Sequence, residues 1–166
     1  MAAPDIVMYE EEFALIKNCI AKLRVDANAK VVFLVDKNGQ QIAAHGELEN
    51  LDTTSLASLT AGNVAATDGL ARLIGEKEFS ILFHEGERDN IHISIVAQRV
   101  ILVVIFDERS SLGLVRLRVK KASVELAEVF ARILTKVERE RSQAGTSFES
   151  PFAEITDDDI DSLFSE

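Results

Sequence analysis

The sequence is poor in the residues and segments that define several protein classes. Its 166 residues include one cysteine, two prolines, one tyrosine and no tryptophan. A single cysteine excludes an intrachain disulfide and favours a reducing compartment. No apolar run approaches the roughly 20 residues that a membrane-spanning helix needs. The first residues, which include Glu10, Glu11 and Glu12, lack the basic and apolar regions of a signal peptide. We therefore expect a cytoplasmic protein.

Basic charge is missing from one end of the chain. The formal net charge is −10, and residues 142–166 carry seven acidic side chains but no lysine or arginine. Residues 1–141 are nearly neutral by comparison, with 21 acidic and 18 basic side chains. Binding to nucleic acid or to an anionic membrane needs a basic surface, so neither is expected as a partner. The composition predicts a domain over 1–141 and a flexible acidic tail over 142–166.

The motifs of nucleotide and metal sites are also missing. Gly62 and Gly69 are not part of the GxxxxGK[ST] pattern of a phosphate-binding loop. The three histidines lack the spacing of metal ligands. Alternating aspartates in the tail resemble the start of a calcium loop, but Ser162 stands where that loop needs glycine. Cys19 falls on a helix edge and is expected to be an inert, packed thiol. We expect no cofactor, no metal and no catalytic site.

Hydrophobic periodicity predicts eight elements along the chain. Helices are expected over 9–24, 53–75 and from Ser110 or Ser111 to about 139, although 114–119 also alternates like a strand. Strands are expected over 29–35, 40–45, 79–84, 91–96 and 100–106. The order α-β-β-α-β-β-β-α is satisfied by one five-stranded antiparallel sheet with helices on its faces, which is an α+β fold.

The helix expected over 53–75 has two unlike faces. Three- and four-residue steps place larger apolar side chains on one stripe, which we assign to the core: Leu56, Leu59, Ala66, Leu70, Leu73 and Ile74. The same steps place very small residues on another stripe: Ser58, Gly62, Ala65 and Gly69, with Ser55 and Ala61 beside them. Glycine inside a helix costs about 1 kcal/mol relative to alanine. Two glycines on one stripe therefore indicate close approach of another backbone. The stripe predicts a protein-docking surface, and the alternative is a helix buried on both sides within its own fold.

The acidic tail contains a short amphipathic motif. Thr156 and the three aspartates after it can cap and begin a helix. Apolar residues around this cap are candidate anchors for a partner: Phe152, Ile155, Ile160, Leu163 and Phe164. A helix this short is marginal alone in water, so we expect it to fold on a partner. The alternatives are a solubilising tail and one that packs on its own domain.

Several segments resemble the Roadblock/LC7 domain. They are VVFLVDKNGQ at 31–40, LDTTSLASLTAGNVAA at 51–66, VVIFD at 103–107 and SLGLVR at 111–116. The tail at 150–164 is similar to the C-terminal end of bacterial members that regulate a GTPase. The likeness covers nearly the whole chain, and its pieces occur in the expected order.

The resemblance implies a homodimer that binds a Ras-like small GTPase of the MglA type. Members of the family pair through the second helix and the third strand, and the paired helices form part of the GTPase-docking face. On this sequence the face comprises Thr54, Ser55, Ser58, Ala61, Gly62, Ala65, Gly69 and Arg72. The resemblance does not resolve which of these residues touch the second copy and which touch the GTPase.

The resemblance also implies how such a protein acts. It would stimulate GTP hydrolysis by repositioning the GTPase's own catalytic residues, without inserting an arginine, and its tail would modulate binding or nucleotide exchange. An inserted arginine would stabilise charge on the phosphoryl group, and the sequence selects none of the candidates Arg72, Arg88, Arg99 and Arg109. A role in cell polarity and gliding motility is implied, and concentration at a cell pole is left open. The alternative is a noncatalytic dimeric scaffold that tethers a GTPase or other cargo.

Overall fold

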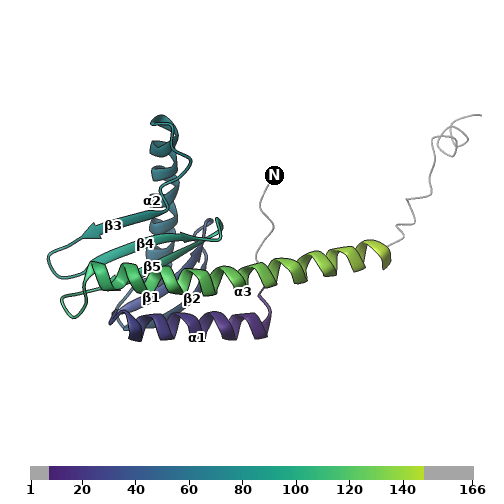
Figure 1. Ribbon diagram of the computed structural model, residues 1–166, viewed down its shortest axis with the longest axis horizontal. Coiled ribbons are helices and arrows are strands. Elements are labelled where there is room, and N and C mark those ends of the chain that lie inside the picture. Colours follow the sequence, from purple (N-terminus) through teal and green to yellow (C-terminus); the bar gives the residue numbers. More distant parts are fainter. Residues whose placement is uncertain (1–7, 148–166) are drawn as a thin grey trace, which may run out of the picture. The chain divides into compact units, whose positions relative to one another are not determined.

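The computed structural model describes residues 8–147 and confirms the expected α+β fold. The elements in chain order are α1 (Glu10–Asp26), β1 (Val31–Asp36), β2 (Gln41–Gly46), α2 (Thr53–Leu73), β3 (Ile81–Glu85), β4 (Asn90–Val96), β5 (Val100–Phe106) and α3 (Leu112–Ser147) (Figure 1). The segment that also alternated like a strand, 114–119, is helical.

The five strands form one sheet in the order β2-β1-β5-β4-β3, and every neighbouring pair is antiparallel. Strands β1 and β5 lie at its centre, where Phe33 pairs with Val103. All seven residues of β5 are buried, which explains its continuous apolar sequence. Strands β2 and β3 are the two edges of the sheet.

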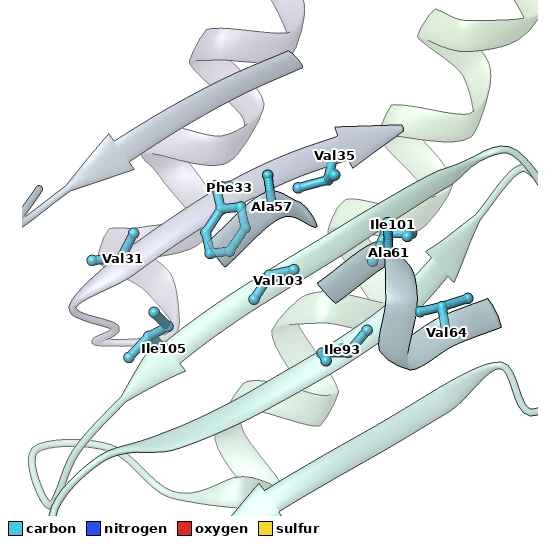
Figure 2. Packing of buried hydrophobic residues seen from close by; sticks show 10 residues of the cluster. All are labelled: Val31, Phe33, Val35, Ala57, Ala61, Val64, Ile93, Ile101, Val103 and Ile105. Carbon is cyan, nitrogen blue, oxygen red and sulfur yellow. The ribbon is translucent and has the colours of Figure 1, made fainter. Parts of the chain in front are cut away.

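Helix α2 covers one face of the sheet (Figure 2). Alternate residues of the strands point to this face because side chains along a strand alternate between faces. The cluster consists of Val31, Phe33, Val35, Ile93, Ile101, Val103 and Ile105 from the sheet, with Ala57, Ala61 and Val64 from α2. The buried side chains that the helix contributes to this cluster are alanine and valine, and the partly buried Leu56 packs against it.

Helices α1 and α3 cover the opposite face. Helix α1 contacts β1 and β2, and Val119 of α3 lines one cavity together with His92 of β4. The two helices contact each other at the Cys19 thiol, which lies 3.9 Å from the Ala122 carbonyl oxygen. Their inward side chains are large and fully buried, as with Ile16 and Leu126.

Helix α3 is longer than the sequence predicted. Its end was expected near 139, with a flexible tail from residue 142, but the helix continues to Ser147. Small polar residues without proline can extend a helix that is already formed. The chain divides into two compact units, Met1–Ile133 and Leu134–Glu166, and α3 has residues in both. The domain boundary at residue 141 stays a prediction. None of the described helices has the length and apolar content to span a bilayer.

Candidate functional site

Helix α2 begins at Thr53, as the sequence predicted, and ends at Leu73, two residues before the predicted end. The Asp52 carboxylate accepts hydrogen bonds from the Ser55 hydroxyl at 2.6 Å and from the Ser55 backbone N–H at 3.0 Å. These bonds stabilise the charged carboxylate and lower the pKa of Asp52. After the C-cap residue Ile74, Gly75 adopts a φ of +80°, which glycine tolerates best.

The face of α2 that packs on the sheet is not the one that the sequence predicted. Its buried residues are Ala57, Thr60, Ala61, Val64 and Ala71. Four residues assigned to the core are instead exposed on the protomer: Leu59 at 72%, Leu70 at 59%, Leu73 at 83% and Ile74 at 68%. Ala66 is exposed too, and only Leu56 packs against the core cluster. The assignment failed because periodicity identifies an apolar stripe without showing whether the protein's own sheet or another molecule covers it.

The small-residue stripe lies on the surface of the protomer. We call Ser58, Gly62, Ala65 and Gly69 the α2 ridge, and all four residues are exposed. A Cβ atom placed on Gly62 or on Gly69 would meet no heavy atom within 4 Å, apart from neighbouring chain and helix backbone. The alternative of a helix buried on both sides within its own fold is therefore wrong. Each glycine costs about 1 kcal/mol of helix stability, and no contact of the described residues explains that cost.

The exposed leucines form a second stripe beside this ridge. We call Leu59, Leu70 and Leu73 the leucine flank. Leu59 and Leu70 lie four residues before and seven residues after Asn63, so helical geometry places them on the side of α2 where Asn63 lies. The Asn63 amide nitrogen lies 2.8 Å from the His84 Nε2 of β3, so this side points towards β3. The sequence showed the spacing of these leucines but did not identify them as an exposed surface, because they were assigned to the core.

The α2 ridge points towards the other side of the molecule. Ser58 is a contact of the β1–β2 turn, because a Cβ atom on Gly39 would lie 3.3 Å from the Ser58 Cα. Gly62, Ala65 and Gly69 follow Ser58 at four, seven and eleven residues, so they lie on the same side of the helix. The ridge and the leucine flank are therefore two adjoining surfaces with different neighbours.

The remaining predicted site residues fall into three groups. Thr54, Ser55 and Arg72 are exposed near the two ends of α2. Ala61 is 9% exposed and packs in the core, so it does not share the exposed face. The tail anchors Phe152, Ile155, Ile160, Leu163 and Phe164 lie outside the described residues.

Strand β3 offers a second unpaired surface next to α2. It is an edge strand, so one row of its backbone N–H and C=O groups has no strand partner in the described sheet. Ile81 is 46% exposed and Phe83 is 37% exposed. Edge strands with apolar side chains are where a second chain adds to a sheet.

Three observations describe the reactive and charged groups within residues 8–147. Within residues 8–147 no group of three or more potential metal-ligating side chains is close enough to hold an ion. Burial raises the pKa of the Cys19 thiol to about 12, which makes it a poor nucleophile. Arg109 is held in exposed ion pairs with Asp107 at 3.0 Å and with Glu47 at 3.4 Å.

Comparison with known proteins identifies relatives of this chain. The sequence profile of the Roadblock/LC7 domain matches residues 15–106. The structure of Myxococcus xanthus MglB is 64% identical and has a TM-score of 0.73, with 76% of this chain and 96% of that chain covered. The gliding protein MglB from Thermus thermophilus is 31% identical and has a TM-score of 0.74, with 79% and 99% covered. A further structure, described as MglB with a tetrameric arrangement, is 30% identical over 80% of this chain and 99% of that chain, with a TM-score of 0.73. A search of curated proteins found no match.

Proposed function

The chain belongs to the Roadblock/LC7 family, and on that premise we propose that it is a homodimeric regulator of a Ras-like small GTPase of the MglA type. It stimulates GTP hydrolysis by holding the GTPase so that the GTPase's own catalytic residues reach the phosphate. Through this activity it contributes to cell polarity and gliding motility. Its 64% identity to an MglB supports the assignment.

The observation that carries the proposal is the exposed side of α2. In the protomer, two glycines and three leucines of one helix face outward, with Leu73 at 83% exposure. Large apolar side chains exposed along one side of a helix are typical of an interaction site. Bare glycine backbone admits a partner to closer contact than any side chain allows. The function therefore needs a partner on α2, and the absence of a phosphate-binding loop from the sequence agrees with a regulator whose partner supplies the nucleotide.

The two stripes receive different partners in this proposal. The leucine flank faces the side of β3, so it contacts the second copy when two β3 edges pair. The α2 ridge faces the β1–β2 turn, and it contacts the GTPase. A self-associating protein is consistent with the tetrameric arrangement described for a 30% identical MglB.

A turnover assay tests the function. Addition of the protein to an MglA-type GTPase loaded with GTP should raise the rate of phosphate release. Gly69→Arg should abolish this stimulation because it places a long charged side chain in a close contact. Gly113→Arg is the matched control, since a Cβ atom on Gly113 of α3 also meets no heavy atom within 4 Å. If wild-type protein binds the GTPase without raising turnover, the chain is a noncatalytic scaffold and the stimulation is disproved.

The arginines provide a second arm of the assay. Single changes of Arg72, Arg88, Arg99 and Arg109 to alanine should leave most of the activity. A loss of about 10³-fold in one variant, the low end for an inserted arginine, would show that the protein supplies a charge to the phosphoryl group. That result would contradict repositioning of the GTPase's own residues.

The tail is proposed to add a second contact with the GTPase. Removal of 148–166 should leave the dimer intact and weaken GTPase affinity or nucleotide exchange. Analytical ultracentrifugation and exchange kinetics on the shortened chain measure the two effects. Unchanged affinity together with unchanged exchange would mean that the tail serves only to solubilise the protein.

A further inference from the structure

A cavity lies between α3 and the sheet, on the face opposite α2. Its volume is about 420 Å³, within the range of small-molecule sites. Its lining includes Ile81, His92 and Ser94 from the sheet and Arg116, Val119 and Lys120 from α3. We call this cavity the α3 pocket. It is on the opposite face because His92 pairs with Val104, whose neighbour Val103 points towards α2.

Two buried polar side chains line the α3 pocket without a hydrogen-bond partner among the described residues. His92 is 1% exposed and Ser94 is 5% exposed. Neither ring nitrogen of His92 nor the Ser94 Oγ bonds to another described residue. Buried polar atoms normally have a partner, and leaving one unpaired costs about 1–3 kcal/mol. Burial, with a smaller effect from Arg116, lowers the pKa of His92, so the ring is neutral at pH 7 and has one N–H to donate.

Two cations stand at the opening of the same pocket. Arg116 and Lys120 are exposed and four residues apart on α3, so their side chains are neighbours on one side of the helix. Neither forms an ion pair with another residue in the part of the chain that the structure describes. Like charges at this spacing destabilise a helix slightly. An anion between them removes that repulsion and accepts charge-assisted hydrogen bonds.

We propose that the α3 pocket binds a small organic carboxylate with a short aliphatic chain. The carboxylate lies between Arg116 and Lys120, and the aliphatic chain lies against Ile81 and Val119. The His92 N–H and the Ser94 hydroxyl donate hydrogen bonds to the carboxylate and fix its orientation. A phosphate suits the pocket less well, because a dianion loses more hydration beside apolar walls and a neutral imidazole. The GTPase contact proposed above uses the other face of the sheet, and the pocket shares only the strand of Ile81, β3, with the proposed dimer contact.

Imidazole NMR of the full-length protein tests the proposal. With ¹⁵N-labelled histidine, hexanoate is the probe, and 1-hexanol and inorganic phosphate are the comparators. Hexanoate should shift the His92 resonances in a saturable way and leave those of the exposed His45 and His84 unchanged. Its Kd should be at least about tenfold lower than the Kd of either comparator, as expected for a charge-assisted contact combined with apolar burial.

Two sets of variants decide whether the cations recognise the carboxylate. The double change Arg116→Gln and Lys120→Gln should raise the Kd for hexanoate at least about tenfold, with no change for 1-hexanol. Both side chains are exposed, so folding is preserved. Lys121→Gln removes an exposed charge next to this pair that does not line the α3 pocket, and it should have no effect. Absence of a saturable His92 shift, or a smaller change in the double variant, overturns the proposal. Neither result bears on the turnover assay.

Discussion

The two faces of the sheet are covered in different ways. On the α1 and α3 face, large side chains such as Ile16, Ile20 and Leu126 point inward and are fully buried. On the α2 face, the helix turns alanine and valine inward, while Leu59, Leu70 and Leu73 point outward. Burial of a leucine contributes about 1.5–3 kcal/mol to folding. The leucines that α2 exposes do not make this contribution in the protomer.

This difference indicates that α2 has two contact surfaces and α3 mainly one. The inward alanines let α2 lie close to the sheet, and the outward stripes are then available to other molecules. The edge strand β3 is open to association as well, and its exposed Ile81 and Phe83 pair with Ser94 and His92, so they lie on the face that α3 covers. The outward stripes of α2 and the β3 edge are thus left for association, whereas the large inward side chains of α1 and α3 are buried within one chain.

The largest expected effect comes from replacing one leucine by alanine on each face of the sheet. Leu126→Ala should lower the free energy of unfolding by about 2–5 kcal/mol, because it opens a cavity in a fully packed core. Leu70→Ala should change the stability of the dilute protomer by less than about 0.5 kcal/mol, as for an exposed position. Urea unfolding at low protein concentration measures both. Equal losses of unfolding free energy in the two variants would show that Leu70 is covered by its own chain. That result would contradict the difference between the two faces of the sheet.

A charge on the leucine flank should break self-association. Leu59→Asp puts a carboxylate into the contact proposed for the second copy, and the dimer should weaken by at least about 2 kcal/mol, or roughly 30-fold in Kd. Val124→Asp is the control, since Val124 is 60% exposed on α3. Sedimentation velocity over a dilution series gives the Kd values. If Leu59→Asp has the same dimer Kd as wild type, the leucine flank is not part of the dimer interface.

Most of the fold follows from local patterns in the sequence. The alternation at 91–96 and the apolar run at 100–106 predicted β4 and β5. These predictions succeeded because strand periodicity is read over a few neighbouring positions. The ends of α3 were harder, since the segment up to Ser147 has a composition that suits either a linker or a helix.

The candidate site could be predicted only in part. The two stripes of α2 were visible, but the leucines were assigned to the core and the α2 ridge to a partner. In the structure both stripes face outward, and Ala57, Ala61 and Val64 face the sheet. Hydrophobicity alone favours leucine over alanine for a core, so a helix that packs closely through alanines inverts the expected order. The α3 pocket could not be predicted, because it joins β4 to α3 through residues distant in the sequence.

Loss of the α2 cap should have a smaller effect, and it should depend on pH. Asp52→Ala removes an acceptor from the first turn and should lower the Tm at pH 7. The pKa of Asp52 is lowered in the folded protein, so the charged form contributes stability above its unfolded value of 3.8, and that stability is lost as the pH falls through the folded pKa. The Tm difference from wild type should therefore shrink below about pH 4. A difference that stays constant down to pH 2 would rule out the charged cap as its cause.

The smallest expected effect separates the α2 ridge from the leucine flank. Gly62→Ala adds a Cβ atom where the protomer has open space, so it should stabilise the helix by up to about 1 kcal/mol. If the α2 ridge contacts the GTPase, this gain persists at every protein concentration while GTPase affinity falls. If the ridge contacts the second copy, the gain disappears at concentrations where the dimer forms, because a weaker dimer stabilises the folded state less.

Gly113→Ala has the same open space and should leave both affinities unchanged. Urea unfolding over a concentration series, together with GTPase titration, distinguishes these outcomes. An unchanged affinity for both partners in Gly62→Ala would mean that the glycines of α2 serve neither contact.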